Sequence, residues 1–440
     1  MKKRNYCTCD KKRKTSKRVV VAAMAGSSLV FVSPADANCV ATTTSVMCDA
    51  GDPYTSPIGS RSAVDGFNVV LGAGSQLNIG DASGITLGNN GSITLQQGAS
   101  VRNTGQQSYG SYGAGANTIE FGYGNTLTIG VGASVTAAGP SGASEAINAM
   151  GDGNTISNRG TIRGGASSAI FFENSGALIG HGRNRIDNFG TIIAGANGEA
   201  LGSYGSVGID FINRPGSTVV GNLNFQGGND TVVLGNDSTF SGNLDGDGGT
   251  NTLRLDADPR NSDLLAGQVK NFTFINKTGL GTWTLGGQLR PNDRTAQATL
   301  AVQAGTLLLG ANYSHFTGTT IVDNAGTLMG AGEQFPQNIT NNGQVLFDQP
   351  TDAVYGGVIS GTGRVTKSGS GALALAGNNT YAGGTTLEAG TLALSGTGTL
   401  GASTGTTTVL GGALDLGGTT QSQAALNQFG GTVRGGTLTP

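Results

Sequence analysis

The stretch Gly356–Leu400 constrains the fold most, because it consists of short alternating strands separated by tight turns. Leu373 and Leu375 lie on one face of a strand, since side chains along a strand alternate with a period of two. Asn378-Asn379 and Gly383-Gly384 provide residues that tolerate the positive φ angles of tight turns. No part of the stretch has apolar residues at helical spacing, so the sequence predicts a ladder of strands.

The same pattern occurs ninety residues earlier. Lys277, Gly279, Gly281, Leu285 and Gly287 repeat the spacing of Lys367, Gly369, Gly371, Leu375 and Gly377. Trp283 stands where Leu373 stands, which predicts that its ring points into a core. The tetrapeptide Ala-Gly-Thr-Leu ends strand-like runs at Ala304–Leu307, Ala325–Leu328 and Ala389–Leu392. Such internal repeats indicate a solenoid, in which each coil buries its apolar face against its neighbours.

The composition agrees with an all-β solenoid. Glycine makes up 78 of 440 residues and charged residues only 12%. Glycine without a three-residue period excludes collagen, and the regularly placed Val, Ile and Leu argue against disorder.

This pattern resembles the passenger-associated repeat of bacterial autotransporters, well over residues 271–400 and loosely before them. The resemblance is carried by Gly361, Gly363, Lys367, Gly369, Gly371, Leu373, Leu375, Gly377, Asn379, Thr380, Tyr381, Gly383, Gly384, Thr385, Gly390, Thr391 and Leu392. It implies a right-handed parallel β-helix of the pectin-lyase type, displayed at the surface of a Gram-negative bacterium or released from it. It also implies passage through the periplasm and an outer-membrane translocator barrel, which we expect to lie outside this sequence because no girdled alternating strands follow.

The N-terminal residues 1–37 are predicted to be a secretory signal peptide. Nine Lys or Arg within residues 1–18 precede the apolar run Val19–Val32, which is too short to span a bilayer. Ala35–Ala37 forms a small-x-small cleavage motif, so cleavage is expected between Ala37 and Asn38. The alternative is a signal anchor that is never cut.

Residues 38–63 are predicted to form an N-terminal cap. Cys39 and Cys48 stand nine positions apart, and in an oxidising compartment they most simply form one disulfide. The alternative is two unpaired thiols.

The net charge of the mature chain limits its partners. After Ala37 there remain sixteen basic and twenty-five acidic residues, which gives a net charge of −9. An acidic, lysine-poor surface argues against nucleic acid and anionic lipid as partners, and no transmembrane segment is expected in the mature chain.

Residues 64–270 are predicted to form irregular coils, and residues 271–440 regular ones. Asn158 and Asn188 occupy equivalent positions thirty residues apart. Asparagine tolerates left-handed backbone, so we expect an asparagine ladder at a corner of the β-helix. The loops expected to project from one side are 106–117, 165–183 and 195–208.

Chemistry-bearing residues are few. The turns between Asp230 and Asp258 invite comparison with calcium-binding nonapeptides, but the copies are twenty-one residues apart, so solvated turn aspartates are the preferred interpretation. The two histidines, His181 and His315, have no partner at metal-ligand spacing. No cofactor is expected.

The predicted function is a non-catalytic adhesin that contacts host-surface, matrix or bacterial-surface ligands through the projecting loops. The alternatives are a carbohydrate-active β-helix enzyme, whose acids would converge from adjacent coils, and a structural spacer. Phe171-Phe172-Glu173 is the one notable acid beside aromatic residues, and such Phe pairs usually belong to a core.

Overall fold

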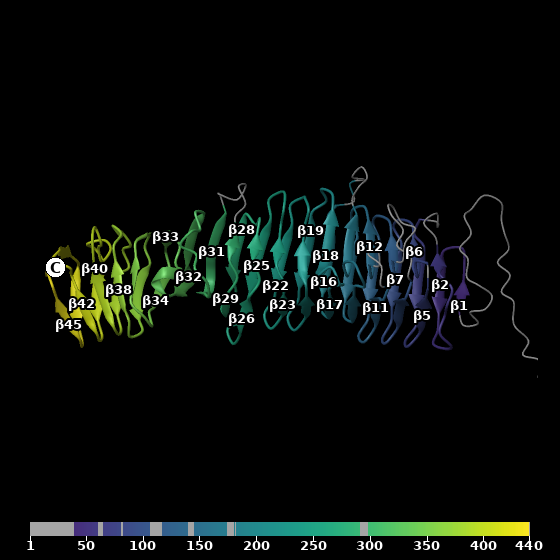
Figure 1. Cartoon of the computed structure of the whole chain (residues 1–440), viewed down its shortest axis with the longest axis horizontal. Helices are drawn as coiled ribbons and strands as arrows, with labels where there is room; N and C mark the ends of the chain where they lie inside the picture. The colour runs from purple at the N-terminus through teal and green to yellow at the C-terminus, as the bar shows by residue number, and fades with distance from the viewer. Residues whose placement is uncertain are drawn as a thin grey trace, which may run out of the picture.

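The computed structural model describes residues 39–59, 65–80, 82–105, 117–139, 145–173, 180, 182–290 and 298–439. The predicted signal peptide and its cleavage site at Ala37 and Asn38 lie outside these residues. The chain forms an elongated rod whose coils follow one another in chain order from β2 to β45 (Figure 1). The predicted parallel β-helix is confirmed.

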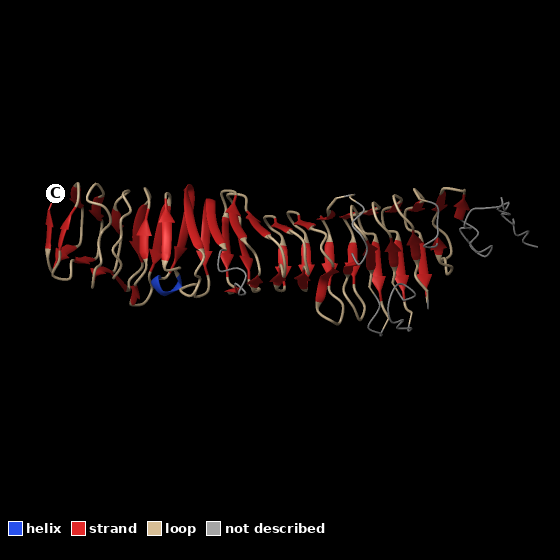
Figure 2. Cartoon of the chain, turned by 90° about the horizontal axis from the view of Figure 1, so that it is seen from above, coloured by secondary structure: helices blue, strands red, loops and turns tan. Residues whose placement is uncertain are grey.

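One short 3-10 helix, η1 (Gly332–Gln334), interrupts the strands of the described part of the chain (Figure 2). The described residues contain no apolar helix of membrane-spanning length.

The first part of the rod has three parallel sheets, A, B and C, visited once per coil. Its sheet A strands are β2 (Ser45–Cys48), β4 (Asn68–Leu71), β7 (Ser92–Leu95), β10 (Thr126–Ile129), β13 (Thr155–Asn158), β16 (Asn184–Asn188), β19 (Ile209–Asn213), β22 (Thr231–Leu234), β25 (Thr252–Asp256) and β28 (Phe274–Thr278). Sheet B contains β5 (Gln76–Ile79), β8 (Ser100–Asn103), β11 (Ser134–Ala137), β14 (Thr161–Arg163), β17 (Thr191–Ile193), β20 (Thr218–Val220) and β23 (Thr239–Ser241). Sheet C contains β3 (Ile58–Gly59), β6 (Ile85–Leu87), β9 (Ile119–Phe121), β12 (Ile147–Met150), β15 (Ile170–Glu173), β18 (Glu199–Tyr204), β21 (Asn222–Asn224), β24 (Leu244–Asp245), β27 (Val269–Lys270) and β30 (Leu289–Arg290).

The cross-section changes where β26 (Ser262–Leu265) and β29 (Thr282–Leu285) join sheet A. Two long strands follow, β31 (Thr299–Leu309) and β32 (Thr319–Gly330), each of which pairs with two shorter strands. The remaining sheet A strands are β33 (Asn338–Asn341), β34 (Gln344–Asp348), β36 (Val358–Ser360), β37 (Arg364–Ser368), β39 (Thr385–Leu387), β41 (Thr406–Val409) and β44 (Ala425–Gln428). Sheet D contains β35 (Ala353–Tyr355), β38 (Ala372–Leu375), β40 (Thr391–Leu394), β42 (Ala413–Asp415) and β45 (Thr432–Arg434), and sheet E pairs β43 (Thr420–Ser422) with β46 (Thr437–Thr439).

Alternation along each strand explains the single continuous core. In β13, Ile156 is fully buried while Ser157 faces outward, and in β14 Ile162 is fully buried while Arg163 is exposed. Since strands of successive coils pair in register, inward side chains form columns along the rod axis, about 4.8 Å apart. This stacking satisfies the backbone polar groups of both strand edges.

Coil length differs between the two halves of the rod. In sheet A, Thr155 of β13 pairs with Arg185 of β16, thirty residues later. From β19 onward the coils shorten: Asp210 pairs with Thr231, twenty-one residues later.

Candidate functional site

The chain begins its described part with a cap. The strand β1 (Cys39–Ala41) pairs antiparallel with β2, and a disulfide joins Cys39 to Cys48 across this pair. The antiparallel strand covers the outer edge of the first sheet A strand, which would otherwise be open to pairing with another chain.

The repeat motif is built around a buried lysine. Lys367, the penultimate residue of β37, is fully buried and donates hydrogen bonds from Nζ to the carbonyls of Ser368 (2.6 Å), Gly369 (2.8 Å) and Ala389 (3.1 Å). The first two carbonyls belong to its own coil and the third to the following coil. Three carbonyl acceptors require three N–H hydrogens, which the ammonium form supplies.

Lys277 makes the same contacts. It is fully buried, and its Nζ donates to the carbonyls of Thr278 (2.7 Å), Gly279 (2.9 Å) and Ala304 (3.0 Å). Burial lowers the pKa of Lys277 to about 8, against an opposing effect of Asp256 and Asp263, so the group is still largely protonated at neutral pH. Burial also lowers the pKa of Lys367.

At both lysines, the corner that contains the lysine is one residue longer than the corner of the next coil on which it stacks. Lys367 and Ala372 pair with Leu387 and Thr391, so the lysine corner contains one residue more than the corner that follows it. Lys277 and Thr282 pair with Val302 and Thr306 in the same way. The ammonium ion lies where the wider turn leaves room, and the Ala-Gly-Thr turn of the next coil supplies its third acceptor. We call this arrangement a lysine clamp.

Gly390 shows why the acceptor turn contains glycine. Its φ is +69°, and a Cβ added there would lie 2.5 Å from the carbonyl oxygens of Gly369 and Gly371 and 2.9 Å from Lys367 Nζ. The lysine spacing and two of the three Ala-Gly-Thr-Leu copies, Ala304–Leu307 and Ala389–Leu392, are therefore the two sides of one contact between coils.

The remaining motif residues serve the same coils. The side chains of Trp283, Leu373, Leu375, Tyr381 and Leu392 are fully buried, as predicted for Trp283. The Trp283 indole N–H donates to the carbonyl of Asp256 (3.1 Å).

Stacking order separates the two copies of the motif. When strand pairing is followed from coil to coil, β28, which contains Lys277, stacks in line with β36. The next strand, β29, stacks in line with β37, which contains Lys367. Lys277 and Lys367 thus occupy two different corners of the coil, because the coil lengths between them do not divide the ninety-residue spacing evenly. The repeat motif therefore specifies the structure of a corner, and the same motif forms either of these two corners of the coil.

A family model described as the passenger-associated-transport-repeat matches residues 303–329 and 365–394. The second match contains both sides of the Lys367 clamp, and the first contains the acceptor turn of the Lys277 clamp. The chain is an autotransporter passenger domain. No curated protein and no solved structure gives a significant match to the passenger.

The predicted asparagine ladder of the passenger is confirmed and extends one coil further. Asn158 Nδ2 donates to Asn188 Oδ1 (2.8 Å), and Asn188 Nδ2 donates to Asn213 Oδ1 (2.8 Å). The thirty-residue spacing did not predict Asn213, because Asn213 follows Asn188 by only twenty-five residues.

The prediction that these asparagines have left-handed backbone is wrong, because Asn158 and Asn188 are the last residues of ordinary strands. The positive φ angles of non-glycine residues in the described chain occur at Asn90, Asp237, Asp247 and Asn271.

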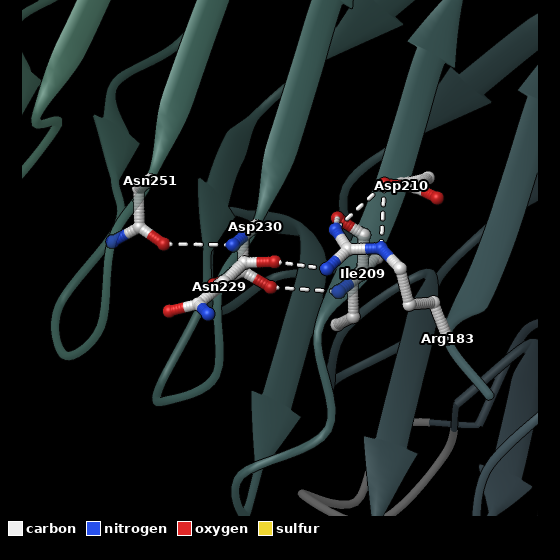
Figure 3. A network of polar contacts seen from close by, with 6 residues as sticks. All are labelled: Arg183, Ile209, Asp210, Asn229, Asp230 and Asn251. Atoms are coloured by element: carbon white, nitrogen blue, oxygen red, sulfur yellow. Dashed lines mark hydrogen bonds and ion pairs between the residues drawn. The ribbon is translucent and has the colours of Figure 1, made fainter.

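A second polar ladder runs along the opposite ends of the sheet A strands (Figure 3). Here a side-chain oxygen of one coil accepts a hydrogen bond from the backbone N–H of the preceding coil. Asp230 Oδ1 accepts from Ile209 N (2.7 Å), and Asn251 Oδ1 accepts from Asp230 N (2.8 Å). Asn251 also donates from Nδ2 to the carbonyl of Asn271 (3.0 Å).

Asp230 is an aspartate at an asparagine position of this ladder. Its side chain is 1% exposed, and its Oδ2 has no hydrogen-bond partner among the described residues. Burial raises its pKa to about 7, although the Ile209 N–H and the charge of Arg183 oppose the shift. The prediction of a solvated turn aspartate is therefore wrong for Asp230.

Acidic side chains gather over sheet C from adjacent coils. Glu145 Oε2 accepts from Asn148 Nδ2 (2.6 Å) and Glu145 Oε1 accepts from Ser167 Oγ (3.3 Å). Burial raises the pKa of Glu145 to about 7, and the charges of Glu173 and Glu120 add to the shift. Convergence of acids is what the enzymatic alternative needs. The sequence did not reveal it, because these acids follow no common spacing.

The prediction that residues 165–183 and 195–208 are loops is wrong in its bounds. Each range contains a sheet C strand, β15 in the first and β18 in the second. Phe172 of β15 is fully buried, as expected for a core Phe, while Phe171 and Glu173 point outward. The expected loop 106–117 lies outside the described residues except for Asn117, and so does His181. Among the described residues, no three His, Cys, Asp or Glu are grouped to hold a metal ion.

Proposed function

We propose that the passenger is a non-catalytic adhesin, secreted to the cell surface or beyond through an outer-membrane translocator barrel. One observation carries this proposal: the rod presents outward sheet faces that continue over many coils. On sheet B, for example, one outward column runs in register through Ser100, Ser134, Thr161, Thr191 and Thr218. Extended solenoid faces are the kind of surface that repeat proteins use for binding.

The test is adhesion of beads coated with the mature chain to host cells, extracellular matrix and bacterial surfaces. We expect saturable adhesion that soluble passenger competes away, whereas beads coated with an unrelated protein of similar net charge do not adhere. Adhesion to none of these surfaces contradicts the proposal and favours a structural spacer.

The second candidate, a carbohydrate-active enzyme, is favoured by the acids over sheet C. A carboxyl group with a pKa of about 7, such as Glu145, is suited to general acid catalysis. The test is release of new reducing ends or unsaturated sugars from neutral and acidic polysaccharides. Cleavage by the wild type that is lost in Glu145→Gln supports an enzyme, and no cleavage by the wild type contradicts it.

A further inference from the structure

Charge is divided between two faces of the rod. The sheet C strands from β3 to β21 contain three carboxylates, Glu120, Glu173 and Glu199, and no Lys or Arg; further along the rod, Asp245 of β24 pairs with Lys270 of β27. The described sheet B strands contain two arginines, Arg102 and Arg163, and no Asp or Glu. For a chain whose mature net charge is −9, a sheet face without carboxylates is unexpected.

Three arginines on this side have no hydrogen-bond or ion-pair partner within the described chain. The described residues include eleven arginines, and the side chains of four of them, Arg102, Arg159, Arg163 and Arg260, form no hydrogen bond or ion pair with a described residue. Three of these four lie on sheet B or at the corner that leads into it. Arg102 and Arg163 share an outward column with Thr136 between them, so their Cα atoms lie about 10 Å apart along the rod.

An aromatic ring stands at the same corner. Phe189 is 38% exposed. The guanidinium carbon of Arg159 lies 4.2 Å from the ring centroid, and that of Arg214 lies 5.5 Å from it. Asp187 holds Arg214 in place through Oδ1 (2.5 Å) and also pairs with Arg185 (2.5 Å). Cation–π stacking thus fixes an exposed ring between two positive charges.

The sheet beside this corner offers hydroxyl groups at every coil. The column from Ser100 to Thr218 continues to Thr239, one hydroxyl about every 4.8 Å. We define the sheet B face as this column together with Arg102, Arg159, Arg163 and Phe189.

We propose that the sheet B face binds a linear polysaccharide that carries carboxylate or sulfate groups. The arginines match the anionic groups, because guanidinium donors fit carboxylate and sulfate oxygens in pairs. The exposed edge of the Phe189 ring, which the two guanidinium groups leave open, provides an apolar contact for a sugar. The hydroxyl column exchanges hydrogen bonds with a polyhydroxylated chain. The sheet C face, being acidic, repels such a ligand, which orients it on the rod. This inference rests on the proposed adhesin function and names the ligand class.

The experiment measures binding of the mature chain to immobilised heparin and to hyaluronate at 50 and 200 mM salt. We expect the wild type to bind at least one of them, more weakly at high salt. The triple variant Arg102→Gln, Arg159→Gln, Arg163→Gln should bind at least about tenfold more weakly. The matched control is Arg254→Gln, Arg260→Gln, Arg364→Gln, which removes the same charge elsewhere and should change binding less than about twofold. All six arginines are exposed, so both variants are expected to fold.

A separate variant tests the sugar. Phe189→Leu should weaken binding to the polysaccharide but leave binding to inorganic polyphosphate unchanged. Equal loss for both ligands, or no loss for either, contradicts the assignment to a polysaccharide. Failure of the wild type to bind heparin and hyaluronate, or equal loss in both triple variants, overturns the inference.

These outcomes are distinct from failure of the adhesin proposal. If the wild type adheres to cells but binds neither polysaccharide, this inference alone is wrong. If it adheres to no surface, the adhesin proposal fails.

Discussion

The two halves of the passenger fasten their coils in different ways. Between β4 and β19, paired sheet A residues lie 24 to 34 positions apart, and asparagine amides connect the coils. Between β31 and β44 the paired residues lie 17 to 22 positions apart, and a lysine clamp connects two of the coils. The long coils contain more residues between their paired strands, whereas in the short coils nearly every residue belongs to a strand or a corner.

Both devices appear in one inward column. Asn158, Asn188 and Asn213 are followed by Leu234, Leu255 and then Lys277, each paired with the next. After the last asparagine of the ladder, apolar side chains continue the column. The lysine follows at the longer corner, where its ammonium group donates hydrogen bonds to the carbonyls. A β-helix corner has to satisfy its inward carbonyls. The long coils do so with neutral amides, whereas the short coils add an ammonium ion to amides such as Asn341 and Asn379, which donate to the carbonyls of Arg364 (2.9 Å) and Thr399 (3.1 Å) in the following coil.

Replacing the clamp lysine should have the largest effect. Lys367→Met keeps the length of the side chain but leaves three carbonyls without their donor, so we expect a loss of about 3–5 kcal/mol in the free energy of unfolding. The control is Leu387→Met, the residue paired with Lys367 in the next coil, which should cost under about 1.5 kcal/mol. Chemical denaturation measures both. Equal stability of the two variants would remove the distinction between the halves.

Repairing the ladder at Asp230 should give a smaller, pH-dependent gain. The pKa of Asp230 is raised from 3.8 to about 7 in the folded chain, so between these values the folded state binds more protons than the unfolded state. Stability contributed by this group therefore falls as pH rises from about 4 to 7. Asp230→Asn should be more stable than the wild type by about 2–4 kcal/mol at pH 8, with little difference below pH 4.

Thermal unfolding followed across this pH range measures the gain. Asp247→Asn, at an exposed turn position with positive φ, is the control and should change the free energy of unfolding by under about 0.5 kcal/mol. A constant difference between Asp230→Asn and wild type at all pH values would contradict the burial argument.

Breaking the amide ladder should cost least. Asn188→Leu removes the acceptor of Asn158 Nδ2 and the donor to Asn213 Oδ1, and we expect a loss of about 1–3 kcal/mol. Amide hydrogen exchange should accelerate in the coils of β13 and β19 and stay unchanged in the coil of β37. Leu255→Met, in the same column, should leave exchange unaltered.

Much of the fold follows from the sequence, because strand alternation and turn residues act locally. The buried Trp283 and the ladder of Asn158 and Asn188 were predictable from spacing alone. The positions of the two lysine clamps were not, since the corner that a residue occupies depends on the summed lengths of all coils in between. For the same reason, the sequence does not predict that Arg102 and Arg163 lie close together. They are sixty-one positions apart in the sequence but only two coils apart in the rod.

Asp230 shows another limit. The sequence places it among acidic turn residues that are mostly exposed, and only the ladder geometry shows its carboxylate taking the place of an amide. The acids over sheet C are hidden for a related reason, because Glu120, Glu145 and Glu173 come from different positions of their coils.

The measurement that tests the account most directly is limited proteolysis of the intact chain, with the surviving fragments identified by mass spectrometry. Because the short coils have few residues outside strands and corners and contain the buried Lys367 clamp, we expect them to be the more stable half. The fragment that survives longest should then contain β37 to β40, including Lys367 and its acceptor Ala389. A surviving fragment that maps to the long coils between β4 and β19 would contradict the account.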